Sequence, residues 1–95
     1  MSDEKVVITA EQAESVLHDG AKTVHNFAQV GPVLLGCDYE REDAILAFKT
    51  AKLIEIGGEG CKGLKHPIVV HDDTGRHTFF EADMAKVEAL ERTLG

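Results

Sequence analysis

Apolar residues recur with a helical period at both ends of the chain and in its middle. Near the N-terminus, Thr9 and Gln12 have the spacing of a capping box, which predicts a helix that begins at Ala10. A C-terminal helix is expected after Asp83, whose side chain is a natural N-cap. The apolar stripes of these two helices are Ala10, Ala13, Val16 and Leu17, and Met84, Val87, Leu90 and Leu94.

Runs of β-branched and aromatic residues predict four short strands, at residues 6–9, 53–56, 67–71 and 77–81. The last two flank a polar turn whose Gly75 suits a left-handed backbone position, so they are expected to form a β-hairpin.

Residues 22–36 allow two interpretations. A kinked helix is favoured because Asn26 and Gln29 repeat the capping-box spacing and apolar residues follow at helical intervals. The alternative is a strand near residues 24–30, a turn at Gly31 and Pro32, and then a short strand or one helical turn at residues 33–35.

A longer helix is expected from Tyr39 to Lys52, with Asp38 as its N-cap and a core-facing side formed by Ala44, Ile45, Phe48 and Ala51. The opposite side of this helix combines one aromatic and one aliphatic residue with acidic neighbours. Such a combination is typical of a protein-binding patch. A solvated helix face, with its leucine packed under another segment, is the alternative interpretation. The opposite side carries Tyr39, Glu42, Asp43, Leu46 and Thr50.

The run LLGCDYEREDAILAFKTAKLIEI, residues 34–56, reads as a helix end, a polar turn, a helix and the start of a strand. With the hairpin at 67–81, this order resembles the winged helix-turn-helix superfamily, over roughly residues 26–82. The resemblance implies a small single α+β domain over residues 1–95, winged-helix-like, with three to four helices and a β-hairpin in its C-terminal half. It also implies a DNA-binding regulator that uses the helix at 39–52 and the wing.

The charge of the chain disfavours nucleic acid as the partner. The formal net charge is −7, and neither half of the sequence carries an excess of Lys and Arg that could neutralise phosphates. Under the DNA-binding alternative, the cations that could grip a backbone are those of the wing and the loop before it. These are Lys62, Lys65, Arg76 and His77.

Composition narrows the remaining classes. The sequence contains no run of about 18 apolar residues, so no membrane span is expected. The charged N-terminus lacks the apolar centre of a signal peptide. Two cysteines in such a chain favour free thiols in a reducing compartment, the cytoplasm, over a disulfide between Cys37 and Cys61. The spacing of Cys61 and the histidines at 66, 71 and 77 matches no standard zinc pattern, so no metal or cofactor is expected.

The sequence therefore predicts a small, non-enzymatic regulatory or adaptor module. It is expected to bind a protein partner, or a second copy of itself, through the acidic and partly apolar face of the helix at 39–52. The alternative is a winged-helix transcriptional regulator that binds DNA.

Overall fold

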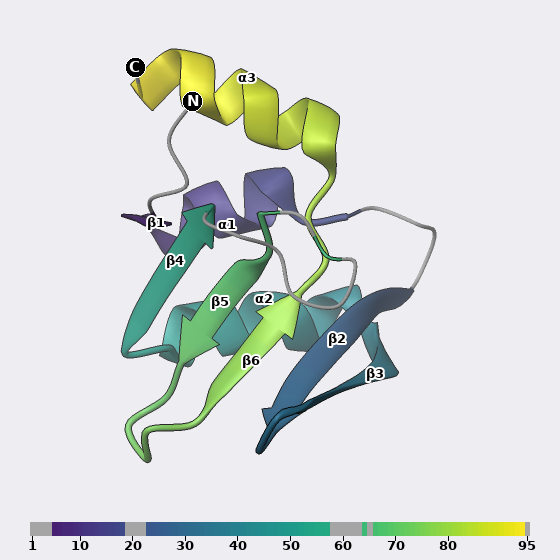
Figure 1. Ribbon diagram of the computed structural model, residues 1–95. Helices are drawn as coiled ribbons and strands as arrows, with labels where there is room; N and C mark the ends of the chain where they lie inside the picture. Colours follow the sequence, from purple (N-terminus) through teal and green to yellow (C-terminus); the bar gives the residue numbers. More distant parts are fainter. Residues whose placement is uncertain (1–4, 19–22, 58–63, 65, 95) are drawn as a thin grey trace.

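The protein folds as a six-stranded antiparallel sheet with its first two helices packed on one face and the C-terminal helix packed against the first helix (Figure 1). The computed structural model describes residues 5–18, 23–57, 64 and 66–94, and within these the strand order is β1-β4-β5-β6-β2-β3. The elements in chain order are β1 (Lys5–Val7), α1 (Ala10–Val16), β2 (Thr23–Val30), β3 (Val33–Glu40), α2 (Arg41–Thr50), β4 (Leu53–Gly57), β5 (Ile68–His71), β6 (His77–Phe80) and α3 (Met84–Leu94).

The core lies between the helices and the sheet face that they cover. Strand alternation turns Ile54, Val70 and Phe80 towards this side, where they join one cluster with the buried residues of the helices. Phe80 is at the centre and is 1% exposed. Its ring meets those of Phe48 and Tyr39 edge-on, at centroid distances of 5.2 and 5.6 Å.

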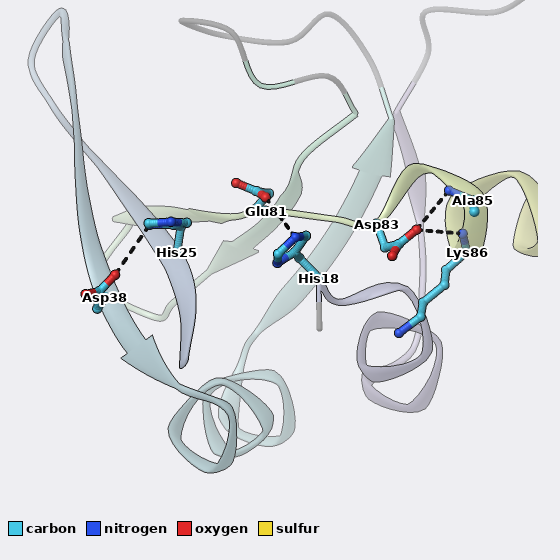
Figure 2. A network of polar contacts seen from close by, with 7 residues as sticks. All are labelled: His18, His25, Asp38, Glu81, Asp83, Ala85 and Lys86. Atoms are coloured by element: carbon cyan, nitrogen blue, oxygen red, sulfur yellow. Dashed lines mark hydrogen bonds and ion pairs between the residues drawn. The ribbon is translucent and has the colours of Figure 1, made fainter. Parts of the chain in front are cut away.

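The predicted caps of the first and last helices are confirmed. In α1 the Gln12 backbone N–H donates to Thr9 Oγ1 at 3.1 Å, and the Thr9 N–H donates to Gln12 Oε1 at 2.9 Å, which completes the capping box. In α3, Asp83 Oδ1 accepts from the backbone N–H of Ala85 at 3.0 Å and of Lys86 at 3.4 Å (Figure 2). Both predictions rested on local sequence, and the bonds they involve are local.

Helix α2 begins directly where β3 ends, and this start differs from the prediction. The pairing of β3 with β2 continues through Asp38, opposite His25, to Glu40, so Asp38 lies in a strand and its predicted role as N-cap is wrong. The N-cap is Glu40, whose side chain makes no capping hydrogen bond. The helix expected from 39 to 52 is therefore the shorter Arg41–Thr50.

The winged-helix architecture expected from the resemblance is wrong, although the α+β class fits the structure. Residues 23–40, which would have supplied the second helix and the turn of that motif, form the antiparallel strands β2 and β3. Helix α2 therefore follows a strand, and the described residues form a sheet of six strands rather than a helical bundle with a wing.

The kinked helix at residues 22–36 is wrong for the same reason. The strand alternative is correct for the first strand and the turn, but the second strand, expected at most over 33–35, extends to Glu40. Gly31 adopts a φ of 60°, a left-handed value that favours glycine, and with Pro32 it turns the chain between β2 and β3. Asn26 and Gln29, which have the spacing of a capping box, both lie in β2 and cap no helix. Asn26 lies opposite Phe80 of β6, while the Gln29 amide donates to the Gly31 carbonyl at 3.2 Å.

The four short strands expected from β-branched runs are present as β1, β4, β5 and β6, and the predicted hairpin of β5 and β6 is confirmed. Gly75 has a φ of 89°, as the turn requires. Asp72 organises the turn, because its Oδ1 accepts hydrogen bonds from the Thr74 N–H at 2.9 Å, the Thr74 hydroxyl at 2.6 Å and the Arg76 N–H at 3.0 Å.

These contacts predict a pH dependence of stability that belongs to Asp72. The Thr74 hydroxyl, followed by the backbone donors of the turn, holds the pKa of this carboxyl below its ordinary value of 3.8. A lowered pKa means that the stabilisation is present above the unfolded-state value and is lost as pH falls through the folded-state value. Urea unfolding at a series of pH values should show that the unmodified protein is more stable than Asp72→Asn at neutral pH. This difference in the free energy of unfolding should shrink only below about pH 4. An unchanged difference at lower pH would contradict this assignment.

Candidate functional site

The outward face of α2 brings together most of the residues predicted to bind a partner. Glu42 and Asp43 are exposed in its first turn, and Leu46 is 59% exposed one turn later. The Thr50 hydroxyl donates to the Leu46 carbonyl at 3.0 Å, so Thr50 lies on the same face. Tyr39 is separate, because it belongs to β3 and its half-buried ring packs on Phe80.

Helix α2 alone offers little apolar contact area. All of its residues are described, and Leu46 is the one large apolar side chain among them that is exposed. Single exposed apolar residues are ordinary on a protein surface. A binding surface that includes α2 therefore needs apolar residues from a neighbouring element.

Strand β3 provides such residues at the margin of the sheet. It pairs with β2 along its whole length and is the last strand in the order, so its other edge has no strand beside it among the described residues (Figure 1). Val33 and Leu35 are 46% and 53% exposed, and Val30, at the end of β2, is 59% exposed. Residues 33–40 contain no Lys, Arg or Pro, the residues that usually protect a free edge from pairing.

Successive residues of β3 direct their backbone N–H and C=O groups alternately towards β2 and towards the free edge. The Glu81 N–H donates to the His25 carbonyl at 3.3 Å, so His25 and every second residue after it in β2 bond towards β6. The intervening residues of β2 bond to β3, which leaves alternate residues of β3 directing their N–H and C=O groups outward. These outward residues are Leu34, Gly36 and Asp38.

Carboxylates gather where β3 passes into α2. Among the charged groups of residues 38–43, Arg41 is turned away from this region, since its Nη2 donates to the Glu14 carbonyl of α1 at 3.4 Å. Asp38 lies 3.5 Å from Nδ1 of His25 across the strand pair (Figure 2). We call the following residues the acidic corner: Asp38, Glu40, Glu42 and Asp43.

Of the four cations proposed for DNA contact, the structure describes two, Arg76 and His77, which are consecutive in the β5–β6 hairpin. Arg76 is exposed in the β5–β6 turn, whereas His77 Nε2 lies 3.0 Å from Gln29 Oε1 and its ring meets Phe79 at 5.6 Å. Lys62 and Lys65 lie outside the described residues.

His77 belongs to a polar row across the sheet face that the helices leave uncovered. His71 and His77 lie opposite each other in the β5–β6 pair, with ring centroids 5.6 Å apart. Glu55 extends the row, at 2.8 Å from His71 Nε2, and Gln29 ends it. Sequence reasoning missed Glu55 and Gln29, because only the strand order β4-β5-β6-β2 brings them beside the histidines.

The described residues contain no group of three or more His, Cys, Asp or Glu side chains arranged to hold a metal ion. Cys37 is a free, exposed thiol, and Cys61, its possible disulfide partner, lies outside the described part of the chain. None of the described helices has both the length and the apolar content that a membrane crossing requires.

Comparisons of the chain with protein-family models, with curated proteins and with solved structures found no match.

Proposed function

We propose that the protein is a small non-enzymatic regulatory or adaptor module that binds an extended segment of a partner protein. The free edge of β3 carries this proposal, because its outward N–H and C=O groups at Leu34, Gly36 and Asp38 can pair with an added strand. Val33 and Leu35 beside this edge supply exposed apolar contacts. The exposed thiol of Cys37 suits a reducing compartment, so the proposal places the protein in the cytoplasm.

The acidic corner indicates the chemistry of the partner segment. It lies at the C-terminal end of β3, whereas the N-terminal end, at Val33 and Leu34, is apolar. Every strand pair in the sheet is antiparallel, and a segment added in the same way would start beside the acidic corner. The expected segment therefore has Lys or Arg first and alternating apolar residues afterwards.

A second copy of the chain fits this edge less well. If two β3 strands paired antiparallel, each acidic end would lie against the uncharged Val33 and Leu34 of the other copy, and β3 itself contains no Lys or Arg to balance it. The DNA-binding alternative rested on a helix-turn-helix arrangement, and residues 33–40 form a strand instead.

The test uses synthetic peptides as long as β3, which has eight residues. One has basic residues in its N-terminal half and alternating valine and threonine in its C-terminal half. A second has the two halves exchanged, and a third has glutamate in place of the basic residues. Fluorescence anisotropy should rank the first peptide tightest, by at least about tenfold over the third.

A matched pair of variants tests whether the edge does the binding. Leu34→Pro removes an outward N–H and places the proline ring where the peptide backbone would lie, so binding should fall by at least about tenfold. Leu34→Ala shortens the same side chain but keeps the N–H, and it should bind within about twofold of the unmodified protein. The double variant Glu42→Lys, Asp43→Lys should weaken the basic peptide selectively.

Three results would overturn the proposal. The first is equal loss of binding in Leu34→Pro and Leu34→Ala. The second is dimerisation in sedimentation experiments that Leu34→Pro abolishes, because the edge would then serve a second copy. The third is tight binding of a randomised DNA duplex that weakens steeply as salt rises.

A further inference from the structure

A small pocket lies on the helix-covered side of the sheet, and Tyr39 of β3 is part of its lining. Its volume is about 160 Å³, close to the ~150 Å³ of a cavity that holds one benzene molecule. The second half of α2 forms one wall through Ala47, Thr50 and Ala51, and strands of the sheet form the other. Phe80 and Val70 contribute apolar surface from the sheet.

Asn26 is the unusual feature of this pocket. Its side chain lines the pocket from β2 and is only 9% exposed, which makes it the one buried polar residue among those described. The Oδ1 atom is buried and has no hydrogen-bond partner within the described structure. Buried amides nearly always have partners, and each exception calls for an explanation. Because Oδ1 is itself buried, a ligand N–H group in the pocket reaches it only when the Asn26 side chain turns this oxygen towards the pocket.

The other polar groups of the pocket also favour a donor. The Thr50 hydroxyl already donates to the Leu46 carbonyl, so its free capacity is as an acceptor. Asp72 reaches the pocket from the β5–β6 turn, and the three described hydrogen bonds of its carboxylate all go to Oδ1. The described lining includes no Lys, Arg or His. An anion would therefore meet a carboxylate and no positive charge in the lining, and Arg76, which interacts electrostatically with Asp72, is not one of the lining residues.

We propose that this pocket binds a compact molecule, about the size of one ring, that presents N–H donors and carries a positive charge or none. Asn26 Oδ1 accepts from the ligand, the Asp72 carboxylate favours a cationic group, and Phe80 and the α2 alanines contact its apolar part. The pocket shares Tyr39 with the edge strand, but the outward residues Leu34, Gly36 and Asp38 do not line it, so the two sites can be tested separately.

Three probes of nearly identical shape test the proposal: benzamidine, benzamide and benzoate. They present a cationic N–H donor, a neutral donor and an anion without a donor. Titration of ¹⁵N-labelled protein, followed by amide chemical shifts, should give the order benzamidine, benzamide, benzoate, with about tenfold or more between the first and the last. The shifts should centre on Asn26, Thr50 and Thr78, which line the pocket.

Variants assign the roles. Asn26→Leu keeps the volume of the side chain and removes the acceptor, so it should weaken benzamidine by at least about tenfold while the spectrum remains that of a folded protein. Asp72→Asn keeps the turn acceptor and removes the charge, so it should reduce the preference for benzamidine over benzamide. Leu46→Ser, on the exposed face of α2, serves as the control and should change nothing.

Benzoate binding as tightly as benzamidine would overturn the proposal. So would undiminished benzamidine binding in Asn26→Leu, or no shift at the pocket residues with any probe at millimolar concentration. The peptide measurements with Leu34→Pro are independent of all three outcomes, because Leu34 is not part of the described pocket lining.

Discussion

Replacing Phe80 by Ala is expected to lower the free energy of unfolding by about 3–5 kcal/mol. Phe80 is 1% exposed, and its ring contacts those of Phe48 in α2 and Tyr39 in β3. The substitution removes the ring at which a helix and two strands meet, and the surroundings can refill the space only in part. Since small domains are stable by only about 5–15 kcal/mol, the variant should be close to unfolding.

Urea unfolding followed by circular dichroism measures this loss, and Phe27→Ala provides the matched control. Phe27 is half-buried on the uncovered face of the sheet, where its ring covers Gly36 and a Cβ at that glycine would lie 2.8 Å from the Phe27 Cε1. Its removal should cost clearly less than that of Phe80, because water can fill the space. Equal losses in the two variants would contradict the central position of Phe80.

Much of this fold was predictable because the signals were local. The capping box of Thr9 and Gln12 and the cap at Asp83 use bonds within one helical turn, and the two helices that they begin, α1 and α3, start where the sequence predicts. The β5–β6 turn was equally visible, because its geometry depends on Gly75 within the turn itself. In each case the residues that determine the structure are those that the pattern contains.

Residues 22–36 were predicted wrongly because their local pattern and their tertiary pairing conflict. Asn26 and Gln29 repeat a helix-start spacing, yet β2 pairs with both β3 and β6, and this pairing determines the backbone conformation. The winged-helix architecture that the resemblance implied is wrong at the same place, since the apolar and small residues at 34–36 serve equally well in a strand. A pattern of residue types does not specify which distant strand lies beside it.

The candidate site shows the same division. The exposure of Leu46 and the acids of α2 followed from helical periodicity. The free edge of β3 did not, because it depends on the order of all six strands. The pocket was equally invisible, since Asn26, Thr50 and Asp72 come from three separate parts of the chain.

Asn26→Leu should stabilise the protein, which is an unusual outcome for a substitution in a buried strand. The buried Oδ1 has no described partner, and an unsatisfied buried polar atom destabilises the folded state by about 1–3 kcal/mol. Leucine has nearly the same shape and no polar atom. We therefore expect the free energy of unfolding to rise by about 1–2 kcal/mol, measured by urea unfolding without ligand. A loss of stability would mean that the amide contributes to the fold, and the pocket would lose its main support.

Asn26→Asp completes this test, because it keeps the shape and adds a charge. No Lys, Arg or His is among the described residues that line the pocket, so burial should raise the pKa of the new carboxyl. An acid with a raised folded-state pKa destabilises the protein at neutral pH, and stability returns as pH falls towards the unfolded value of about 4. Asn26→Asp should thus be less stable than the unmodified protein at neutral pH, whereas Asn26→Leu is more stable. Benzamidine should reverse part of the loss in Asn26→Asp, since a bound cation stabilises the ionised carboxylate and only the folded state binds it. That combination separates an amide retained for binding from one retained for folding, because a purely structural amide predicts losses in both variants and no rescue by the ligand.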